Sequence, residues 1–106
     1  MNLETYLVSE QRKFRNRKKI LTENDKHKFY YQREFINFCV REGVKDAKNI
    51  RHREYVNYVR YLKDVKKNNE RTVLDKCYIV KTFLEKIDCS FIPNPWRRYN
   101  ANTDAR

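Results

Sequence analysis

Glycine and proline are almost absent from this sequence of 106 residues, which has one glycine, Gly43, and two prolines, Pro93 and Pro95. Because these residue types form most tight turns and interrupt helices, the chain has few places to turn sharply. Charged residues make up 37% of the sequence and aromatic residues 14%, a composition that suits solvated helices around an aromatic core. The sequence therefore predicts an all-α fold in one small domain, in which a large enclosed active site is not expected.

The charge balance is strongly positive, with 25 Lys and Arg against 14 Asp and Glu and a net charge of +11. A polyanion is then the natural partner, and nucleic acid is the first candidate. No apolar run approaches the roughly 18 residues that a membrane span requires. Acidic Glu4 and Glu10 stand where a signal peptide would have its basic and apolar segments. We therefore expect a cytoplasmic protein that does not interact with membranes.

The clearest helix is predicted for residue 23 to residue 41 or 42. Thr22 followed by Asp25 resembles a capping box with Asp in place of Glu or Gln. Gly43 stands where a helix that ends near Glu42 favours a residue in the left-handed conformation. One face of this helix is apolar and carries Tyr31, Phe35, Phe38 and Cys39.

Two further helices are predicted after a connection at residues 44–50. The second runs from about residue 51 to about residue 66, and no ordinary cap precedes it unless Asn49 supplies one. The third has Asn68 or Asn69 as its N-cap and continues to Ile87. These three main helices, with an N-terminal arm or helix, predict a small orthogonal or antiparallel bundle. The inner faces are expected to carry Tyr55, Val59 and Leu62, and then Val73, Cys77, Val80, Leu84 and Ile87.

The two ends of the chain differ from the helical region, which is predicted to cover residues 22–91. Residues 1–21 are predicted to be a basic N-terminal arm or short helix, because residues 11–19 hold six basic side chains and no acidic one. Such a segment is either a solvated terminus or a contact for a phosphate backbone. Two prolines in residues 92–106 prevent a helix from continuing and favour an extended path.

The start of the third predicted helix presents a cation and a hydroxyl group together. A helix N-terminus has unpaired N–H groups and a partial positive charge, and it can therefore cradle a phosphate. Because loops alternate between the ends of an antiparallel bundle, the first and third helices would begin at the same end and could share a cationic surface. The predicted DNA-binding residues are Lys26, His27 and Lys28 at the first start, and Lys67, Asn69, Arg71, Thr72 and Lys76 at the third.

Two other sets of side chains have a simpler structural interpretation. The basic residues of the second helix spread around its polar face, as solvated side chains do. A set of tyrosines could stack on the bases of a single strand, but their helical spacing favours packing in the core and at its boundary. These tyrosines are Tyr30, Tyr55, Tyr58, Tyr61 and Tyr78.

The sequence holds no motif for catalysis. GxSxG, Walker and paired-carboxylate patterns do not occur, and one glycine cannot build a phosphate-binding loop. Cys39, Cys77 and Cys89 are odd in number and lack CxxC spacing, so we expect reduced thiols. A metal site needs several His or Cys ligands close together, and His27 and His52 are the only histidines, so we predict neither a metal nor another cofactor.

Several short motifs follow one another in a specific order. An aromatic pattern ends in Phe38-Cys39, Gly43 follows, Ile50 opens the second helix, Arg71-Thr72-Val73 opens the third, and Asn94-Pro95 comes last. Over residues 22–96 this order resembles the core-binding, SAM-like N-terminal domain of the tyrosine recombinases, the family of the phage integrases. In that family the third helix commonly begins with a basic or polar residue before Thr, and an Asn-Pro marks the passage into the catalytic domain.

The resemblance implies a helical domain that clamps one face of double-stranded DNA during DNA integration and site-specific recombination. It further implies other recombinase protomers on the same DNA, and a prokaryotic, viral or mobile-element origin. The first turns of the first and third helices, with Lys26–Lys28 and Arg71, Thr72 and Lys76, would lie at the DNA. The catalytic residues of the family belong to a domain that would follow Asn94-Pro95. Residues 92–106 are then a linker toward an absent catalytic domain, and we expect no enzymatic activity from this chain alone.

Two alternatives to duplex binding stay open. A basic protein-interaction module would dock an acidic partner in a stoichiometric complex and would not bind duplex DNA. An RNA or single-strand binder would depend more on its tyrosines than on its lysines. The clustering of cations at helix starts favours duplex phosphates over base stacking.

Overall fold

The computed structural model describes residues 1–87 and 92–93 of the chain. Within these residues the regular elements are four α-helices and a 3-10 helix, and the only extended pairing is an isolated bridge between Asn2 and Asp46. The predicted all-α fold is therefore confirmed. No helix in this part of the chain has the length and apolar character to cross a membrane. The chain divides into two compact units, Met1–Asn49 and Ile50–Arg106.

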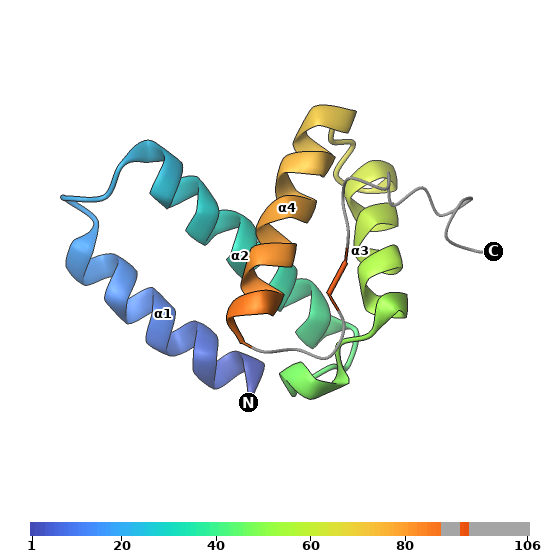
Figure 1. Ribbon diagram of the computed structural model, residues 1–106, viewed down its shortest axis with the longest axis horizontal. Coiled ribbons are helices and arrows are strands. Elements are labelled where there is room, and N and C mark those ends of the chain that lie inside the picture. The colour runs from blue at the N-terminus through green and yellow to red at the C-terminus, as the bar shows by residue number, and fades with distance from the viewer. Residues whose placement is uncertain (88–91, 94–106) are drawn as a thin grey trace. The chain divides into compact units, whose positions relative to one another are not determined.

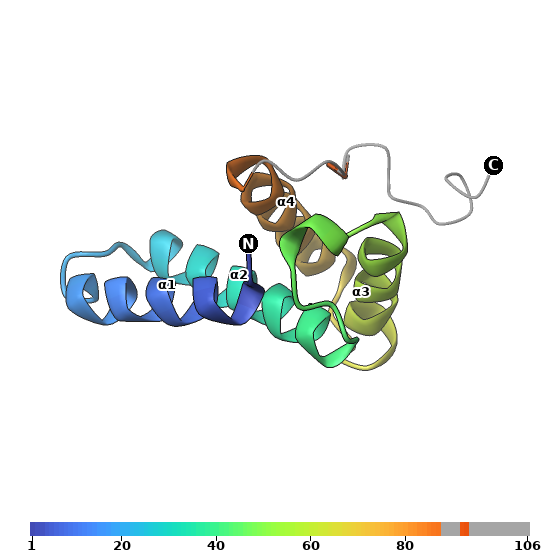
Figure 2. The same cartoon turned by 90° about the horizontal axis from the view of Figure 1, so that it is seen from below.

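The first unit is built on two helices, α1 (Leu3–Arg17) and α2 (Glu23–Arg41). They contact each other and run in opposite directions, as Figure 1 shows, and Figure 2 shows α1 lying along α2. Asn2 caps α1, because its Oδ1 accepts a hydrogen bond from the Thr5 backbone N–H at 2.9 Å. Thr22 caps α2 as predicted, and its Oγ1 accepts from the Asp25 N–H at 3.1 Å.

The end of α2 is a Schellman motif centred on Gly43, which has a φ of +89° as the sequence predicts. The Val44 N–H donates to the Cys39 carbonyl at 2.9 Å, and the Gly43 N–H donates to the Val40 carbonyl at 3.0 Å. These two bonds satisfy carbonyls that the helix leaves without partners and reverse the chain direction. The predicted helix of residues 23 to 41 or 42 is thus confirmed at both ends.

The N-terminal segment is a helix of 15 residues rather than a bare arm. Its beginning is held against the loop that follows α2, because the Leu3 N–H donates to the Lys45 carbonyl at 2.8 Å and the Ala47 N–H donates to the Met1 carbonyl at 2.9 Å. Leu3 and Leu7 are the buried residues of α1. A short 3-10 helix, η1 (Ala47–Asn49), closes the first unit.

The second unit contains α3 (His52–Asp64) and α4 (Glu70–Lys86), which contact each other. A cap by Asn49, the option that the sequence left open for α3, does not form, since the N-cap residue is Arg51. Glu54 satisfies this start from inside the helix, because its Oε1 accepts from the Arg51 N–H at 2.7 Å. Asn69 caps α4 as predicted, and its Oδ1 accepts from the Thr72 N–H at 2.8 Å.

The buried faces agree closely with the sequence pattern. Tyr31 and Ile87, both expected on apolar faces, are only half-buried. Ile36, Tyr58 and Phe83 are buried in addition to the expected apolar residues of α2, α3 and α4. Cys89, the Asn94-Pro95 motif and all but Ile92 and Pro93 of the predicted linker lie outside the described residues. The expected core residues that are buried are Phe35, Phe38, Cys39, Tyr55, Val59, Leu62, Val73, Cys77, Val80 and Leu84.

Candidate nucleic-acid interface

The start of α4 offers an exposed guanidinium but few free hydrogen-bonding groups. Arg71 is exposed, and its Nε lies 3.5 Å from Asp75 Oδ1, one turn along the helix. Asn69 is occupied as the N-cap, and the Thr72 N–H is its partner. An incoming phosphate would therefore meet the Arg71 side chain first. The ion pair with Asp75 is solvent-exposed and contributes little, so it can be exchanged for a phosphate contact.

The two lysines predicted near the start of α4 have different environments. Lys67 is exposed and lies in the turn before α4, with a positive φ of 55°. Lys76 is buried, with 6% of its surface accessible. Its Nζ donates to Asn68 Oδ1, in the turn before α4, at 2.9 Å. This placement gives Lys76 a structural role in holding the turn between α3 and α4. Lys67 and Arg71 are then the exposed cations among the residues predicted at the start of α4.

The start of α2 is also capped, and its cations are accompanied by carboxylates. Lys26 is half-buried, and its Nζ lies 3.3 Å from Glu23 Oε1. The His27 ring stacks on Tyr31 with centroids 6.0 Å apart. Lys28 is exposed. Among the predicted residues at this start, His27 and Lys28 are the most accessible to a ligand.

Acidic residues reduce the positive charge at both helix starts. Glu23 and Asp25 stand in the first turn of α2, and Glu70 begins α4 with Asp75 one turn later. Carboxylates are favoured at helix N-termini for the same electrostatic reason that a phosphate would be, so they compete with a phosphate for these starts. Since α2 belongs to the first unit and α4 to the second, a surface shared by the two starts stays a prediction.

The densest group of exposed cations lies along the C-terminal half of α1 and the turn after it. Within this group Lys13 has an acidic neighbour, since its Nζ lies 3.2 Å from Glu10 Oε2. The group coincides with the run of basic residues that the sequence places in the N-terminal arm, and α1 carries its members up to Arg17. Its exposed members are Arg12, Lys13, Arg15, Arg17, Lys18 and Lys19.

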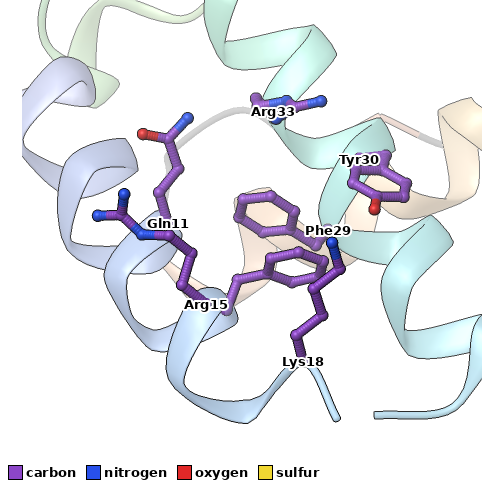
Figure 3. Close-up of a pocket in the computed structure, with 7 residues that line it drawn as sticks. Gln11, Arg15, Lys18, Phe29, Tyr30 and Arg33 are labelled. Carbon is purple, nitrogen blue, oxygen red and sulfur yellow. The ribbon is translucent and has the colours of Figure 1, made fainter.

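A cleft of about 520 Å³ lies between α1 and α2 in the first unit (Figure 3). Its centre is aromatic: Phe14 and Phe29 stack with centroids 4.3 Å apart and an interplanar angle of 14°, and Tyr30 lies 5.5 Å from Phe14. The sequence analysis missed this site, because the rings come from two helices that meet only in the fold. Its seven lining residues are Gln11, Phe14, Arg15, Lys18, Phe29, Tyr30 and Arg33.

Of the other residues singled out in the sequence, the two described cysteines are core residues. Cys39 and Cys77 are buried and form no disulfide. Burial raises the pKa of the Cys77 thiol to about 11, although the Tyr55 hydroxyl acts in the opposite direction. In the described part of the chain, no three His, Cys, Asp or Glu side chains gather as a metal site requires. Tyr55 and Tyr58 are buried, as the packing interpretation predicts, whereas Tyr78 is exposed.

The geometry of the first unit and of α4 therefore presents three cationic surfaces, at the starts of α2 and α4 and along α1, and one aromatic cleft. Comparison of the chain with family models, with curated proteins and with solved structures found no match.

Proposed function

We propose that this chain binds double-stranded DNA, mainly through phosphate contacts made by exposed cations on its helices. The observation that carries the proposal is the net charge of +11 together with the ordered, exposed cations of α1 and of the two helix starts. A surface of this kind attracts the phosphate backbone by releasing the counterions that surround DNA. Affinity should therefore come largely from charge and depend little on base sequence.

In the proposed interface, the helix starts hold a phosphate at a defined position. Arg71 is the best candidate, because it is exposed and its ion-pair partner, Asp75, is an exposed carboxylate on the same helix. Thr72 stands beside it in the first turn of α4, and Lys67 lies in the preceding turn. A phosphate at this point would receive the guanidinium and lie near the positive end of the helix dipole.

The finer proposal is a core-binding domain of the tyrosine-recombinase type. Three observations support it: the all-α fold, the position of Gly43 at the end of α2, and the position of Arg71 and Thr72 in the first turn of α4. These are the places at which the resembling motifs are expected. In this proposal the chain contributes affinity and part of the site recognition during DNA integration, and strand cleavage is carried out by a separate catalytic domain.

Titration of a fluorescent duplex with the chain, followed by gel shift or anisotropy, tests the proposal. If about six phosphates are contacted, the logarithm of the affinity should fall with the logarithm of salt concentration with a slope of roughly −5. Arg71→Ala should weaken binding by about 1 to 3 kcal/mol if the guanidinium reads a base, and by less if it meets only phosphate. Arg60→Ala removes another exposed arginine, from α3, and serves as the matched control.

Two results would count against the proposal in different ways. Equal affinities of the Arg71→Ala and Arg60→Ala variants would remove the start of α4 from the interface. The absence of duplex binding at low salt, combined with a stoichiometric complex with an acidic protein, would favour the alternative of a protein-interaction module.

A further inference from the structure

The aromatic cluster of the first unit is open to solvent, unlike the core aromatics. Phe14, Phe29 and Tyr30 are each half-buried, whereas Phe35 and Tyr58 are fully buried. The three rings nevertheless contact one another closely, and the Phe14 and Phe29 rings are nearly parallel. A cluster that served only to stabilise the unit would gain more from complete burial. Part of the ring surface is therefore exposed to solvent, beside the faces that the Phe14–Phe29 stack covers, and can be contacted by a planar ligand.

Cations surround these rings. The Arg33 guanidinium lies over both α2 rings, with its central carbon 5.6 Å from the Phe29 centroid and 5.3 Å from the Tyr30 centroid. Arg15 comes from α1, and the Lys18 side chain extends from just after α1 toward Phe29 (Figure 3). No carboxylate stands among the seven lining residues, in contrast to the starts of α2 and α4. The cleft is thus more uniformly positive than the surfaces predicted from the sequence.

The combination of ring faces and cations defines the chemistry of the ligand. A phosphate alone would need the cations but no rings, and a neutral apolar ligand would need the rings but no cations. A nucleotide uses both, because its base stacks on aromatic side chains and on guanidinium planes while its phosphate meets lysine and arginine. The cleft volume of about 520 Å³ lies within the usual range for small-ligand sites. Paired bases inside a duplex do not present their faces, so the nucleotide must be unpaired.

We propose that the cleft between α1 and α2 binds an unpaired nucleotide of a DNA strand. The base lies against the exposed parts of Phe29 and Tyr30 and the Arg33 guanidinium, and the phosphate lies beside Lys18 and Arg15. This inference rests on the proposed partner, nucleic acid, but uses none of the residues at the starts of α2 and α4. It gives the chain a second mode of contact, directed at strand ends or locally opened DNA, beside the phosphate contacts to the duplex.

Fluorescence anisotropy with two short single strands of equal length tests the base requirement. One strand carries adenines and the other carries abasic sites, so that the two have the same phosphates. The adenine strand should bind at least about fivefold more tightly, which corresponds to roughly 1 kcal/mol of stacking. Tyr30→Ala should abolish most of this preference. Circular dichroism checks that the variant keeps its helix content.

A matched pair of lysine variants tests the location without disturbing the rings. Lys18→Gln and Lys19→Gln each remove one exposed charge from adjacent positions, but only Lys18 lines the cleft. We expect Lys18→Gln to weaken adenine-strand binding at least about threefold more than Lys19→Gln, and the two variants to affect duplex binding equally. Should Tyr30→Ala lose its helices, this pair and the abasic strand still decide the question.

The outcomes separate this inference from the proposed function. Equal binding of the two strands, with equal effects of the two lysine variants, overturns the nucleotide site even if duplex binding is strong. Loss of duplex binding with a retained base preference overturns the duplex proposal instead. Competition by dAMP identifies the source of the nucleotide: displacement means that a free nucleotide suffices, and no displacement means that the strand is required. If polyglutamate displaces the adenine strand as well as dAMP does, the inference is overturned in favour of an acidic peptide.

Discussion

At the scale of single residues, Glu54 is the buried acidic side chain among those that the structure describes. It is 4% exposed, its Oε1 accepts from the Arg51 N–H at 2.7 Å, and its Oε2 lies 3.1 Å from Arg53 Nε. Glu54→Ala would leave the Arg51 N–H, at the start of α3, without its acceptor and would remove a buried side chain. We expect the free energy of unfolding to fall by about 1 to 3 kcal/mol, measured by urea denaturation.

Arg53→Ala is the matched control, because it removes only the exposed half of the same ion pair. The Arg53 side chain is 82% exposed, so its loss should cost less than about 0.5 kcal/mol. Similar costs for the two variants would mean that Glu54 acts through the ion pair rather than as a cap for α3.

The Cys77 thiol gives the stability a dependence on alkaline pH. Its pKa is raised from 9.0 to about 11 by burial, so the folded state keeps a proton that the unfolded chain releases. The contribution is complete below about pH 9 and is lost as the pH rises toward 11. Cys77→Ala removes this group. Between about pH 8 and pH 10.5, the unfolding free energy of the unmodified protein should fall by on the order of 2 kcal/mol more than that of the Cys77→Ala variant.

Other groups also titrate in this alkaline range, and the comparison with Cys77→Ala cancels their effects. The measurement is a pair of urea denaturation curves at each pH. A difference between the proteins that stays constant across the range would show that the thiol ionises as easily in the folded state as in the unfolded chain.

At the scale of elements, the end of α2 depends on one backbone conformation. Gly43 has a φ of +89°, and a Cβ added there would meet no atom within 4 Å. The cost of a substitution therefore comes from the backbone alone and not from crowding. Gly43→Ala should lower the free energy of unfolding by about 1 kcal/mol, and Gly43→Asn by less, because Asn adopts the left-handed conformation more readily. Thermal unfolding of the two variants measures the order, and an Asn variant less stable than the Ala variant would contradict it.

The ends of α2 and the start of α4 were predictable because their signals are local. Thr22, Gly43 and Asn69 each act within a few residues of the helix end that they satisfy, so the sequence alone places them. The cap of α3 was missed because Glu54 reaches back from inside the helix. The choice between arm and helix for residues 1–21 was undecided, because α1 is held by Leu3, Leu7 and the loop after α2, which are tertiary contacts.

The candidate site was only partly predictable for the same reason. Exposure of Arg71 and Lys67 follows from their positions at a helix start and in a turn. Burial of Lys76 does not follow from its position, since its Nζ donates to Asn68, eight residues earlier in the turn before α4, and no helix-start pattern predicts that bond. The cleft had one sequence signal, a phenylalanine within the basic run of residues 11–19, but the ring that stacks on Phe14 comes from a distant part of the chain.

At the scale of the whole molecule, the question is whether net charge or its placement would govern the proposed binding of DNA. If a diffuse positive field attracts DNA, every exposed cation contributes equally to the affinity. In a defined interface, the cations that contact phosphates contribute more than the others. The distribution of charge supports placement, because α1 carries its cations close together while the helix starts hold carboxylates among theirs. The basic residues of α3 were assigned to a solvated face, so they provide the comparison.

Two double variants decide between these views. Arg12→Gln with Arg17→Gln removes two exposed charges from α1, and Arg53→Gln with Arg60→Gln removes two from α3, so both lower the net charge equally. We expect the α1 variant to make the salt slope of duplex binding shallower by about 1.8, which is 0.9 per lost phosphate contact, and the α3 variant to leave the slope nearly unchanged. Arg53→Gln should cost little stability, so both proteins can be compared in the folded state. Equal changes in slope would mean that the duplex senses only the overall charge, and the cations of α1 would then have no special place in the interface.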